Sequence, residues 1–208
     1  MAEGGTLPVV LVHGFLSTRE MLGLLGARLW SKGFDVHFTA LSPLCIQDVR
    51  KLARELDATV LRVLKRTGAP RCHLVGISQG GLIGVYYIKV LDGREKVGRL
   101  VSVGTPFAGT WAPAAGMVAV PWLGVVSRGV WQTMPLSSLL RELAGIPLPE
   151  GIEATSISIQ GDLIAPPARC RLEGARNVVL EGAPPLIGHQ WMGFSPAVAD
   201  AIGEALTR

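Results

Sequence analysis

The sequence predicts an α/β protein built on a mostly parallel sheet, and three observations lead to this fold class. Short runs rich in Val, Leu and Ile alternate along the chain with segments of helical periodicity. These short runs are almost continuously apolar, which is typical of parallel strands that helices cover on both faces. Polar residues able to do chemistry directly follow several of the runs, where α/β proteins hold their sites. We therefore expect about six strands, most of them parallel, with helices on both faces of the sheet.

The individual elements follow from the apolar pattern in chain order. The apolar runs predict strands at residues 8–12, 34–39, 72–77, 98–103, 154–160 and 176–181. Apolar residues three and four positions apart predict helices at residues 19–31, 46–67, 79–91, 136–144 and from residue 196 onward. The last helix has a good start, because Ser195 can cap it and Pro196 suits its first position. No repeat or linker interrupts the pattern, so residues 1–208 are expected to form one domain.

One segment, residues 106–133, breaks the alternation of strands and helices. It is rich in Gly, Pro, Ala and Val, carries three of the five tryptophans and has a single charged residue, Arg128. An insertion this apolar is either a packed part of the core or a lid over a hydrophobic site. We expect a small apolar lid, in which Phe107, Met117 and Trp122 would line the substrate pocket.

The composition indicates which kinds of partner, and which cellular compartment, to expect for this chain. The formal net charge is +4, and the densest basic stretch lies on the helix expected at residues 46–67, as a solvated outer face. We therefore expect no nucleic-acid partner. Three cysteines without metal-ligand spacing argue against a disulfide framework and fit a reducing compartment. No export signal or membrane-length apolar stretch is visible, so the chain as given is expected to be cytoplasmic, with secretion of a processed form left open.

The most informative motif is the string LVGISQGG at residues 74–81. It places Ser78 in the pattern G-x-S-x-G, directly after an apolar run and directly before a helical pattern. A serine in that setting lies on a nucleophile elbow, a sharp strand-to-helix turn that raises its hydroxyl above the end of a sheet. The turn crowds its flanks, so side chains at Gly76 and Gly80 would collide with the neighbouring strand or helix. Ser78 is therefore the candidate nucleophile.

An elbow serine needs an acid and a histidine, which follow it in that chain order. Asp162 comes after the apolar run at residues 154–160 and is the candidate acid, with Glu181 after the next strand as the reserve. His189 lies beyond Asp162, in a Gly-flanked segment expected to be a flexible loop, and is the candidate base. Of the other histidines, His13 is expected to shape the loop after the first strand. His37 and His73 are expected to be structural, because both lie inside predicted strands.

A reacting carbonyl also needs preorganised N–H donors for the negative charge that develops on its oxygen. The amide of Gln79 follows the nucleophile at the start of a helix and is the expected first donor. The amide of Phe15 is the expected second donor, because Gly14 lets the chain turn sharply after the strand at residues 8–12.

These motifs together carry a resemblance that covers the chain from about residue 7 to the final helix. The strings LVHGF, GISQGG, VGTPFAGT, GDLIAPP and IGHQWMGFSP resemble those of bacterial lipases and esterases of the α/β-hydrolase superfamily. They are most similar to the small ones akin to triacylglycerol lipases and to GPI-inositol-deacylase-like proteins. The chain has Phe107 and Ile77 where histidine is usual in that family, and both departures make the surroundings more apolar. The resemblance implies a minimal form of the fold that begins at its usual third strand.

The resemblance implies ester hydrolysis through Ser78, His189 and Asp162, with Phe15 and Gln79 as oxyanion donors. We expect a serine carboxylesterase or lipase that acts as a monomer on an apolar acyl ester or lipid. It would need no cofactor or metal and would make transient contact with a lipid interface. Two alternatives stay open. A thioesterase or acyltransferase would use the same triad, and a non-catalytic protein could bind apolar ligands on the same fold.

Overall fold

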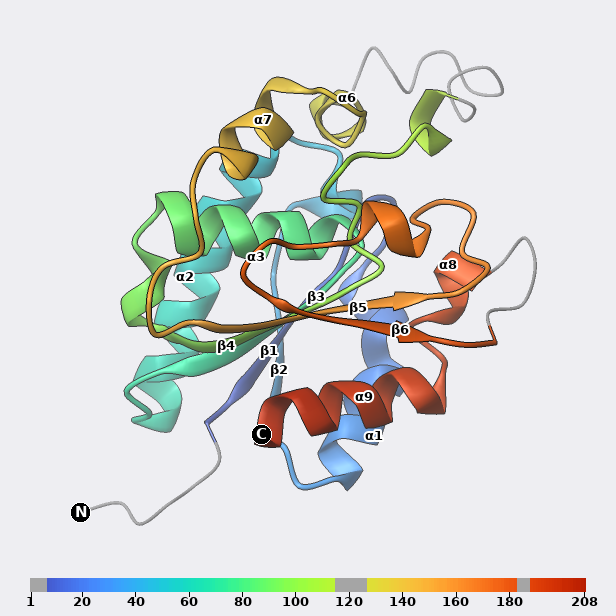
Figure 1. The fold of residues 1–208 in the computed structure, drawn as a ribbon. Helices are drawn as coiled ribbons and strands as arrows, with labels where there is room; N and C mark the ends of the chain where they lie inside the picture. Colours follow the sequence, from blue (N-terminus) through green and yellow to red (C-terminus); the bar gives the residue numbers. More distant parts are fainter. Residues whose placement is uncertain (1–6, 115–126, 183–187) are drawn as a thin grey trace.

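The computed structural model describes residues 7–114, 127–182 and 188–208. Their strands form one six-stranded, all-parallel sheet (Figure 1). From one edge to the other the strands are β2 (Val36–Phe38), β1 (Val9–Val12), β3 (Cys72–Ile77), β4 (Val97–Val103), β5 (Glu153–Ile159) and β6 (Arg176–Leu180). The predicted α/β class with a parallel sheet is confirmed.

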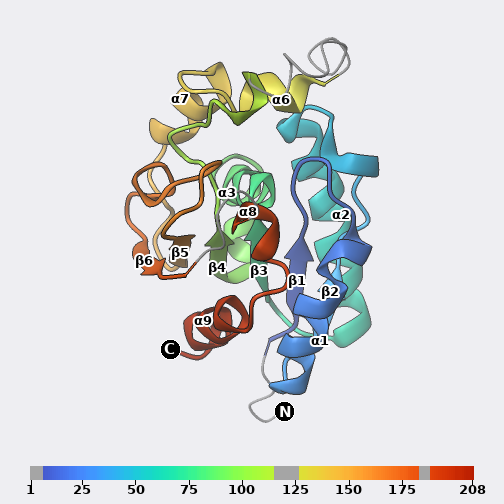
Figure 2. The ribbon, with the colours of Figure 1, turned by 90° about the vertical axis from the view of Figure 1, so that its right-hand side faces the viewer.

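Helices cover both faces of the sheet (Figures 1 and 2). One face carries α2 (Val49–Thr67), α3 (Gln79–Val90) and α7 (Ser138–Ala144), and the other carries α1 (Gly23–Ser31) and α9 (Pro196–Thr207). The described residues also form short 3₁₀ helices: η1 (Arg19–Leu22), η2 (Pro43–Cys45), η3 (Gly93–Glu95) and η4 (Pro167–Arg169). Within the described part of the chain, no helix has the length and apolar character needed to cross a membrane.

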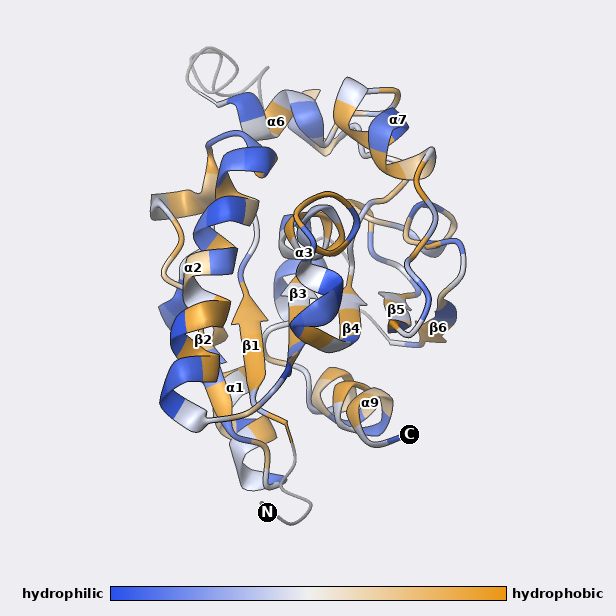
Figure 3. Cartoon of the chain, turned by 90° about the vertical axis from the view of Figure 1, so that its left-hand side faces the viewer, coloured by the Kyte–Doolittle hydropathy of each residue, from blue (hydrophilic) through white to orange (hydrophobic). Residues whose placement is uncertain are grey.

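Adjacent residues of β1 belong to two separate hydrophobic cores, one on each face of the sheet. Val10 and Val12 of β1 belong to the core under α2 and α3, whereas Val9 and Leu11 belong to the core under α1 and α9. Burial on both faces is why these strands appear in the sequence as continuous apolar runs. Figure 3 shows hydrophobic strands inside the molecule and hydrophilic residues along the outer side of α2.

Some local features differ from the sequence-based expectation. The helix expected over residues 19–31 starts as the 3₁₀ helix η1, and the helix expected from residue 46 begins at Val49. Asp48 sets that start, because its Oδ1 accepts a 2.8 Å hydrogen bond from the amide of Arg50. Short helices of the described residues also lie where none was expected, and they include α6 (Arg128–Gln132) and α8 (Gly188–Trp191).

Helix α6, inside the predicted lid segment, is fastened to the start of α2. Ser127 Oγ donates to the carbonyl oxygen of Ile46 at 2.8 Å, and Gln132 Oε1 accepts a hydrogen bond from the amide of Val49 at 2.7 Å. The first amides of a helix have no partner within the helix, so Gln132 satisfies one of them. As a result α6 lies beyond the arrowhead end of β1 (Figure 2).

The strand order reverses between β1 and β3. The next strand along the chain from β1, which is β2, lies on one side of β1, and β3 lies on the other. Ligand sites of open α/β sheets form at such a reversal, outside the carboxyl ends of the strands. The loop after β1 and the turn after β3 meet there, and they carry Phe15 and Ser78.

Candidate active site

Ser78 lies on the turn between β3 and α3, and its backbone conformation is strained. Its φ of 56° and ψ of −126° are rare for a residue that has a side chain. The glycines around it make the turn possible. A β-carbon at Gly76 would lie 2.5 Å from the amide nitrogen of Gly81, and one at Gly80 would lie 2.2 Å from the carbonyl oxygen of Val12. The crowding predicted at positions 76 and 80 is therefore present, against the helix in the first case and the strand in the second.

The turn is also held by Thr105, which follows β4. Thr105 Oγ1 donates a 2.8 Å hydrogen bond to the carbonyl oxygen of Ser78. A β-carbon at Gly81 would lie 2.1 Å from that Oγ1, so the glycine lets the hydroxyl reach the strained residue. Sequence patterns alone do not assign Thr105 this role, although the residue lies in the string VGTPFAGT directly after a predicted strand.

Ser78, His189 and Asp162 form a continuous chain of hydrogen bonds. His189 Nε2 lies 2.8 Å from Ser78 Oγ, and His189 Nδ1 lies 2.7 Å from Asp162 Oδ2. In this arrangement an imidazole can take a proton from a serine while a carboxylate orients it. The prediction that His189 lies in a flexible loop is wrong, because the residue belongs to the one-turn helix α8. The glycine before it is the first residue of that turn rather than a break in the structure.

Asp162 is buried, and its hydrogen-bond partners favour the carboxylate form. Its Oδ1 accepts hydrogen bonds from the amides of Ile164 at 2.8 Å and Ala165 at 3.0 Å, while Oδ2 faces His189. Burial alone would raise the pKa of Asp162, but the bonds from His189 and the two amides outweigh burial and hold the pKa below its usual value. Asp162 is therefore ionised at neutral pH, and it favours the tautomer of His189 that carries a proton on Nδ1.

One predicted N–H donor, Gln79, directly follows Ser78, and the other, Phe15, belongs to the loop that packs against the elbow. Phe15 follows Gly14, where a β-carbon would lie 3.0 Å from Cβ of Ser78 and 3.2 Å from the amide nitrogen of Gln79. Only glycine lets the loop after β1 approach the elbow this closely. Among the described residues, the amides of Phe15 and Gln79 have no hydrogen-bond partner, so an oxygen of a bound molecule could accept from both.

Gly104 and Met192 set where helix α8 docks. Gly104 directly follows β4 with a φ of +57°, and a β-carbon there would lie 2.3 Å from Cε of Met192 and 3.4 Å from Cε1 of His189. Met192 is fully buried directly after α8 and belongs to the core under α1 and α9. The position of the imidazole thus depends on a contact between two segments that no local pattern connects.

The other histidines and the reserve acid lie outside this chain of hydrogen bonds. His37 in β2 and His73 in β3 are buried within strands, and burial, with two nearby arginines, lowers the pKa of His73 to about 4. His13 Nδ1 lies 3.4 Å from the carbonyl oxygen of Gly14, and burial lowers the pKa of this histidine. Glu181 is exposed after β6. Asp162 is thus the carboxylate that contacts His189.

The cysteines are buried free thiols: Cys45, Cys72 and Cys170. Burial raises the pKa of each thiol to about 12. Thiols with so high a pKa stay protonated and are weak nucleophiles.

Of the three residues predicted to line a substrate pocket, the structure describes only Phe107. Phe107 is partly buried after β4 and packs against the core under α2 and α3. Met117 and Trp122 lie in residues 115–126, outside the described residues. Trp111 and Trp131, on either side of that range, keep 58% and 52% of their surface exposed. The described parts of the segment present apolar surface, and its role as a lid stays a prediction.

Two cavities lie near β1 and β2, and Ser78 lines neither of them. The smaller, of about 280 Å³, is lined by residues of the loop after β1, including His13 and Thr18. The larger, of about 450 Å³, lies at the β2 edge of the sheet. Neither cavity is therefore an acyl pocket that opens on the serine.

The sequence matches the model of the palmitoyl protein thioesterase family over residues 8–138. A triacylglycerol lipase from Pseudarthrobacter phenanthrenivorans is 33% identical over 110 residues, which cover 50% of this chain and 34% of that lipase. A triacylglycerol lipase from Burkholderia plantarii is 33% identical over 110 residues, covering 50% of this chain and 30% of that one. The chain thus spans about a third of the length of these curated relatives.

Solved structures are similar to this chain over its whole length. The mature form of Bacillus licheniformis lipase BlEst2 has a TM-score of 0.79, covering 100% of this chain and 95% of that chain at 15% identity. Aspergillus fumigatus lipase B has a TM-score of 0.78, covering 99% of this chain and 54% of that chain at 21% identity. Likeness at such low identity shows the fold alone, and it is the α/β-hydrolase fold that the motifs predict.

Proposed function

The chain belongs to the palmitoyl protein thioesterase family, and on that premise we propose that it is a serine hydrolase that cleaves apolar acyl esters. In this proposal Ser78 is the nucleophile, His189 is the general base and then the general acid, and Asp162 orients His189. The amides of Phe15 and Gln79 form the oxyanion hole.

The observation that carries the proposal is the unbroken hydrogen-bond chain from Asp162 through His189 to Ser78. The amides of Gln79 and Phe15, which have no partner among the described residues, support it. Ser78 Oγ attacks the ester carbonyl carbon while its proton passes to His189 Nε2. The two amides donate to the oxygen that becomes negative, and each such donor typically lowers the barrier by about 3–4 kcal/mol. His189 then protonates the leaving alcohol, and the acyl group remains on Ser78. Water, activated by the same imidazole, releases the acid.

The surroundings of Asp162 support its role as the orienting group. A carboxylate that stays ionised in a buried site stabilises the imidazolium that forms when His189 takes the serine proton. The two backbone amides that bond Oδ1 leave Oδ2 directed at His189, so the carboxylate has one orientation. The strained turn at Ser78 adds to this preorganisation, because it holds the hydroxyl next to the imidazole before any substrate arrives.

The substrate carries an apolar acyl chain in this proposal, and residues 106–133 supply the surface that contacts it. Phe107, Met117 and Trp122 are the proposed contacts. Replacing Met117 or Trp122 by serine should then slow hydrolysis of long-chain esters more than that of short-chain esters, in an assay across a series of acyl lengths. Equal losses at every length, with a lower melting temperature, would show that the segment is part of the core.

A thioesterase is the second candidate, because the family is described by that activity while the curated relatives are named triacylglycerol lipases. Both activities use the same nucleophile and oxyanion hole, but a thiolate is a better leaving group than an alkoxide and depends less on protonation by His189. Rates on an oxyester and a thioester with the same acyl chain decide between them. Acyl transfer to an added alcohol, measured in the same reactions, would reveal an acyltransferase.

The direct test compares Ser78→Ala with the matched control Ser137→Ala, since Ser137 caps α7. A fluorophosphonate probe should label the wild-type chain and the control but not Ser78→Ala. Ester hydrolysis should follow the same pattern, with unchanged circular dichroism for Ser78→Ala. An active and normally folded Ser78→Ala variant would disprove the mechanism. A wild-type chain that resists the probe and cleaves no ester would be a non-catalytic binder.

A further inference from the structure

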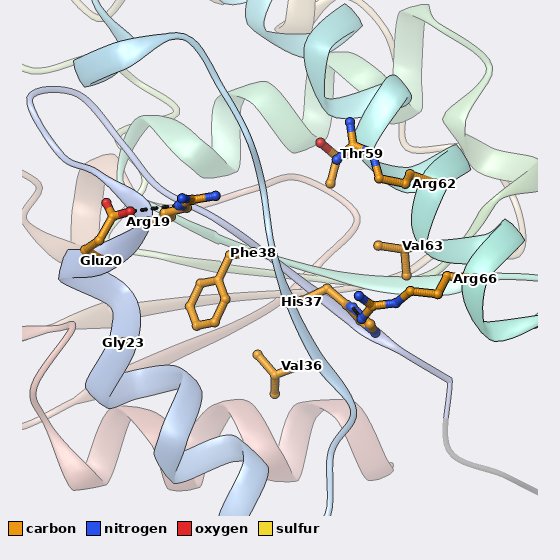
Figure 4. Close-up of a pocket in the computed structure, with 10 residues that line it drawn as sticks. All are labelled: Arg19, Glu20, Gly23, Val36, His37, Phe38, Thr59, Arg62, Val63 and Arg66. Carbon is orange, nitrogen blue, oxygen red and sulfur yellow. Dashed lines mark hydrogen bonds and ion pairs between the residues drawn. The ribbon is translucent and has the colours of Figure 1, made fainter.

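The larger cavity, of about 450 Å³, lies across the free edge of the sheet at β2 (Figure 4). Among the strands of the described residues, β2 pairs with β1 alone, so the other side of β2 faces away from the sheet. The residues that line the cavity come from η1 and the start of α1 on one side of the strand, and from α2 on the other (Figure 4). A volume of several hundred Å³ is in the range of pockets that hold small organic ligands.

The edge strand directs unpaired backbone groups into this cavity. The carbonyl oxygen of Asp35 and the amide of Thr39 bond to β1. Backbone groups of alternate residues point to opposite sides of a strand, so the N–H groups of Val36 and Phe38 point away from β1. Both residues line the cavity, and neither amide has a partner among the described residues. These two N–H groups are available as donors.

The charged residues that line the cavity have a net positive charge of two. They are the guanidinium groups of Arg19, Arg62 and Arg66 and the carboxylate of Glu20. Glu20 pairs with Arg19 at 2.7 Å, which leaves two arginines without a carboxylate partner within the described part of the chain. Arg62 and Arg66 lie one turn apart on α2 and face the cavity together (Figure 4).

Two consecutive hydrogen bonds, through His37 of β2, hold Arg66 in place. Arg66 Nη2 donates to His37 Nδ1 at 2.6 Å, and His37 Nε2 donates to Asp35 Oδ2 at 2.8 Å. An arginine has no acceptor atom, so His37 Nδ1 must accept here. Such a fixed guanidinium loses little conformational freedom when it binds an anion. These two hydrogen bonds also give the buried His37 a structural role, as the sequence predicts.

Apart from the hydroxyl of Thr59, the rest of the lining is apolar. Val36, Phe38 and Val63 line the cavity together with the arginines. The ring of Phe38 lies against α1, where a β-carbon at Gly26 would be 2.5 Å from its Cζ. The cavity thus combines a cationic part with an apolar part.

We propose that this cavity binds a phosphate monoester with a small apolar or aromatic substituent. A phosphate monoester carries about −1.5 to −2 charges at neutral pH, which matches the net charge of the lining, whereas a carboxylate would leave one cation uncompensated. Arginine guanidinium groups bind phosphate oxygens through paired hydrogen bonds, and the two strand amides add donors for further oxygens. The phosphate is that of a soluble organic phosphate or of a lipid headgroup, since the two share this chemistry.

Arginines beside an edge strand can also serve only to prevent aggregation. That role needs the positive charge but not the guanidinium geometry, so Arg62→Lys and Arg66→Lys distinguish the two explanations. Lysine keeps the charge and loses the bidentate contact. Arg54→Gln is the matched control, because Arg54 is an exposed residue of the same helix that does not line the cavity.

The test uses the full chain and isothermal titration with phenyl phosphate, inorganic phosphate, benzoate and benzyl alcohol. Phenyl phosphate should bind more tightly than the other three compounds. Arg62→Gln, Arg66→Gln and the two lysine variants should each weaken that binding about ten- to a hundredfold. Arg54→Gln should stay within about twofold of wild type. Equal weakening by Arg54→Gln, or full binding by the lysine variants, would overturn the proposal.

A second arm separates the two sources of the phosphate. Vesicles of phosphatidylcholine with and without phosphatidic acid are sedimented with wild type, Arg62→Gln and Arg54→Gln. Binding that needs both phosphatidic acid and Arg62, without phenyl phosphate binding, assigns the site to a lipid headgroup. Phenyl phosphate binding without vesicle binding assigns it to a soluble phosphate. If neither probe binds the wild-type chain, the proposal is wrong.

Discussion

Replacing Asp162 by asparagine tests the proposed triad sharply, because the structure dictates which way the new amide must face. Asp162 Oδ1 accepts hydrogen bonds from the amides of Ile164 and Ala165. In Asp162→Asn only the side-chain oxygen can accept those bonds, so the NH₂ group must point at His189 Nδ1. His189 Nδ1 must then become an acceptor, and the ring proton moves to Nε2, the atom that lies 2.8 Å from Ser78 Oγ.

An imidazole that carries its proton on Nε2 cannot take a proton from Ser78. We expect kcat to fall about 10⁴-fold, the loss known for this change in Ser-His-Asp proteases, or about 5.5 kcal/mol in the barrier. KM should change little, because Asp162 is buried behind His189 and does not contact substrate. Ser78→Ala and His189→Ala should each lose more, since they remove the nucleophile and the base themselves. Their double mutant should be little worse than either single variant.

The assay is the initial rate of p-nitrophenyl ester hydrolysis, with urea unfolding as a check that the fold persists. Glu181→Gln is the matched control, because Glu181 is exposed and does not bond His189. It should retain wild-type kcat. Asp162→Asn activity within tenfold of wild type would refute the tautomer argument. A larger loss in Glu181→Gln would show that Glu181 is the acid.

Three further predictions rest on the same site. Gly104→Ala should lower the free energy of unfolding, measured in urea, by about 1–3 kcal/mol. The reason is that φ at this position is +57° and the new β-carbon would lie 2.3 Å from Cε of Met192. A variant as stable as the wild type would contradict this. Thr105→Val should lower the free energy of unfolding by about 1 kcal/mol and reduce kcat, because Ser78 loses the hydrogen bond that holds its turn. Thr105→Ser should keep the hydroxyl and the wild-type rate. Equal rates in the two variants would exclude this role of Thr105. The pKa of Asp162 is lower in the folded chain than its usual 3.8, so its stabilising effect is present above that value and is lost as the pH falls through the folded pKa. Unfolding free energies should therefore drop more steeply in acid for wild type than for Asp162→Asn, and parallel curves would count against the assignment.

The sequence alone determined those features that arise from neighbours along the chain. A strand buried on both faces must be apolar throughout, so the runs at residues 8–12 and 72–77 predicted β1 and β3, and the predicted parallel sheet is confirmed. The elbow at Ser78 was predictable for a similar reason, since its sharp turn tolerates only glycine at positions 76 and 80. Chain order then selected Asp162 and His189 as candidates, because both follow Ser78 and both lie after predicted strands.

Only the tertiary structure decided the contacts between segments that are distant in the chain. The helical turn that holds His189 depends on Met192 packing against Gly104, and the strained turn at Ser78 depends on a hydroxyl from Thr105. The cavity at β2 likewise joins arginines of η1 and α2 that the sequence shows only as scattered basic residues. Apolar periodicity specifies which face of an element is buried, but not which neighbour covers it. These contacts depend on how the helices dock on the sheet, and that docking is set by side-chain shapes across the whole core.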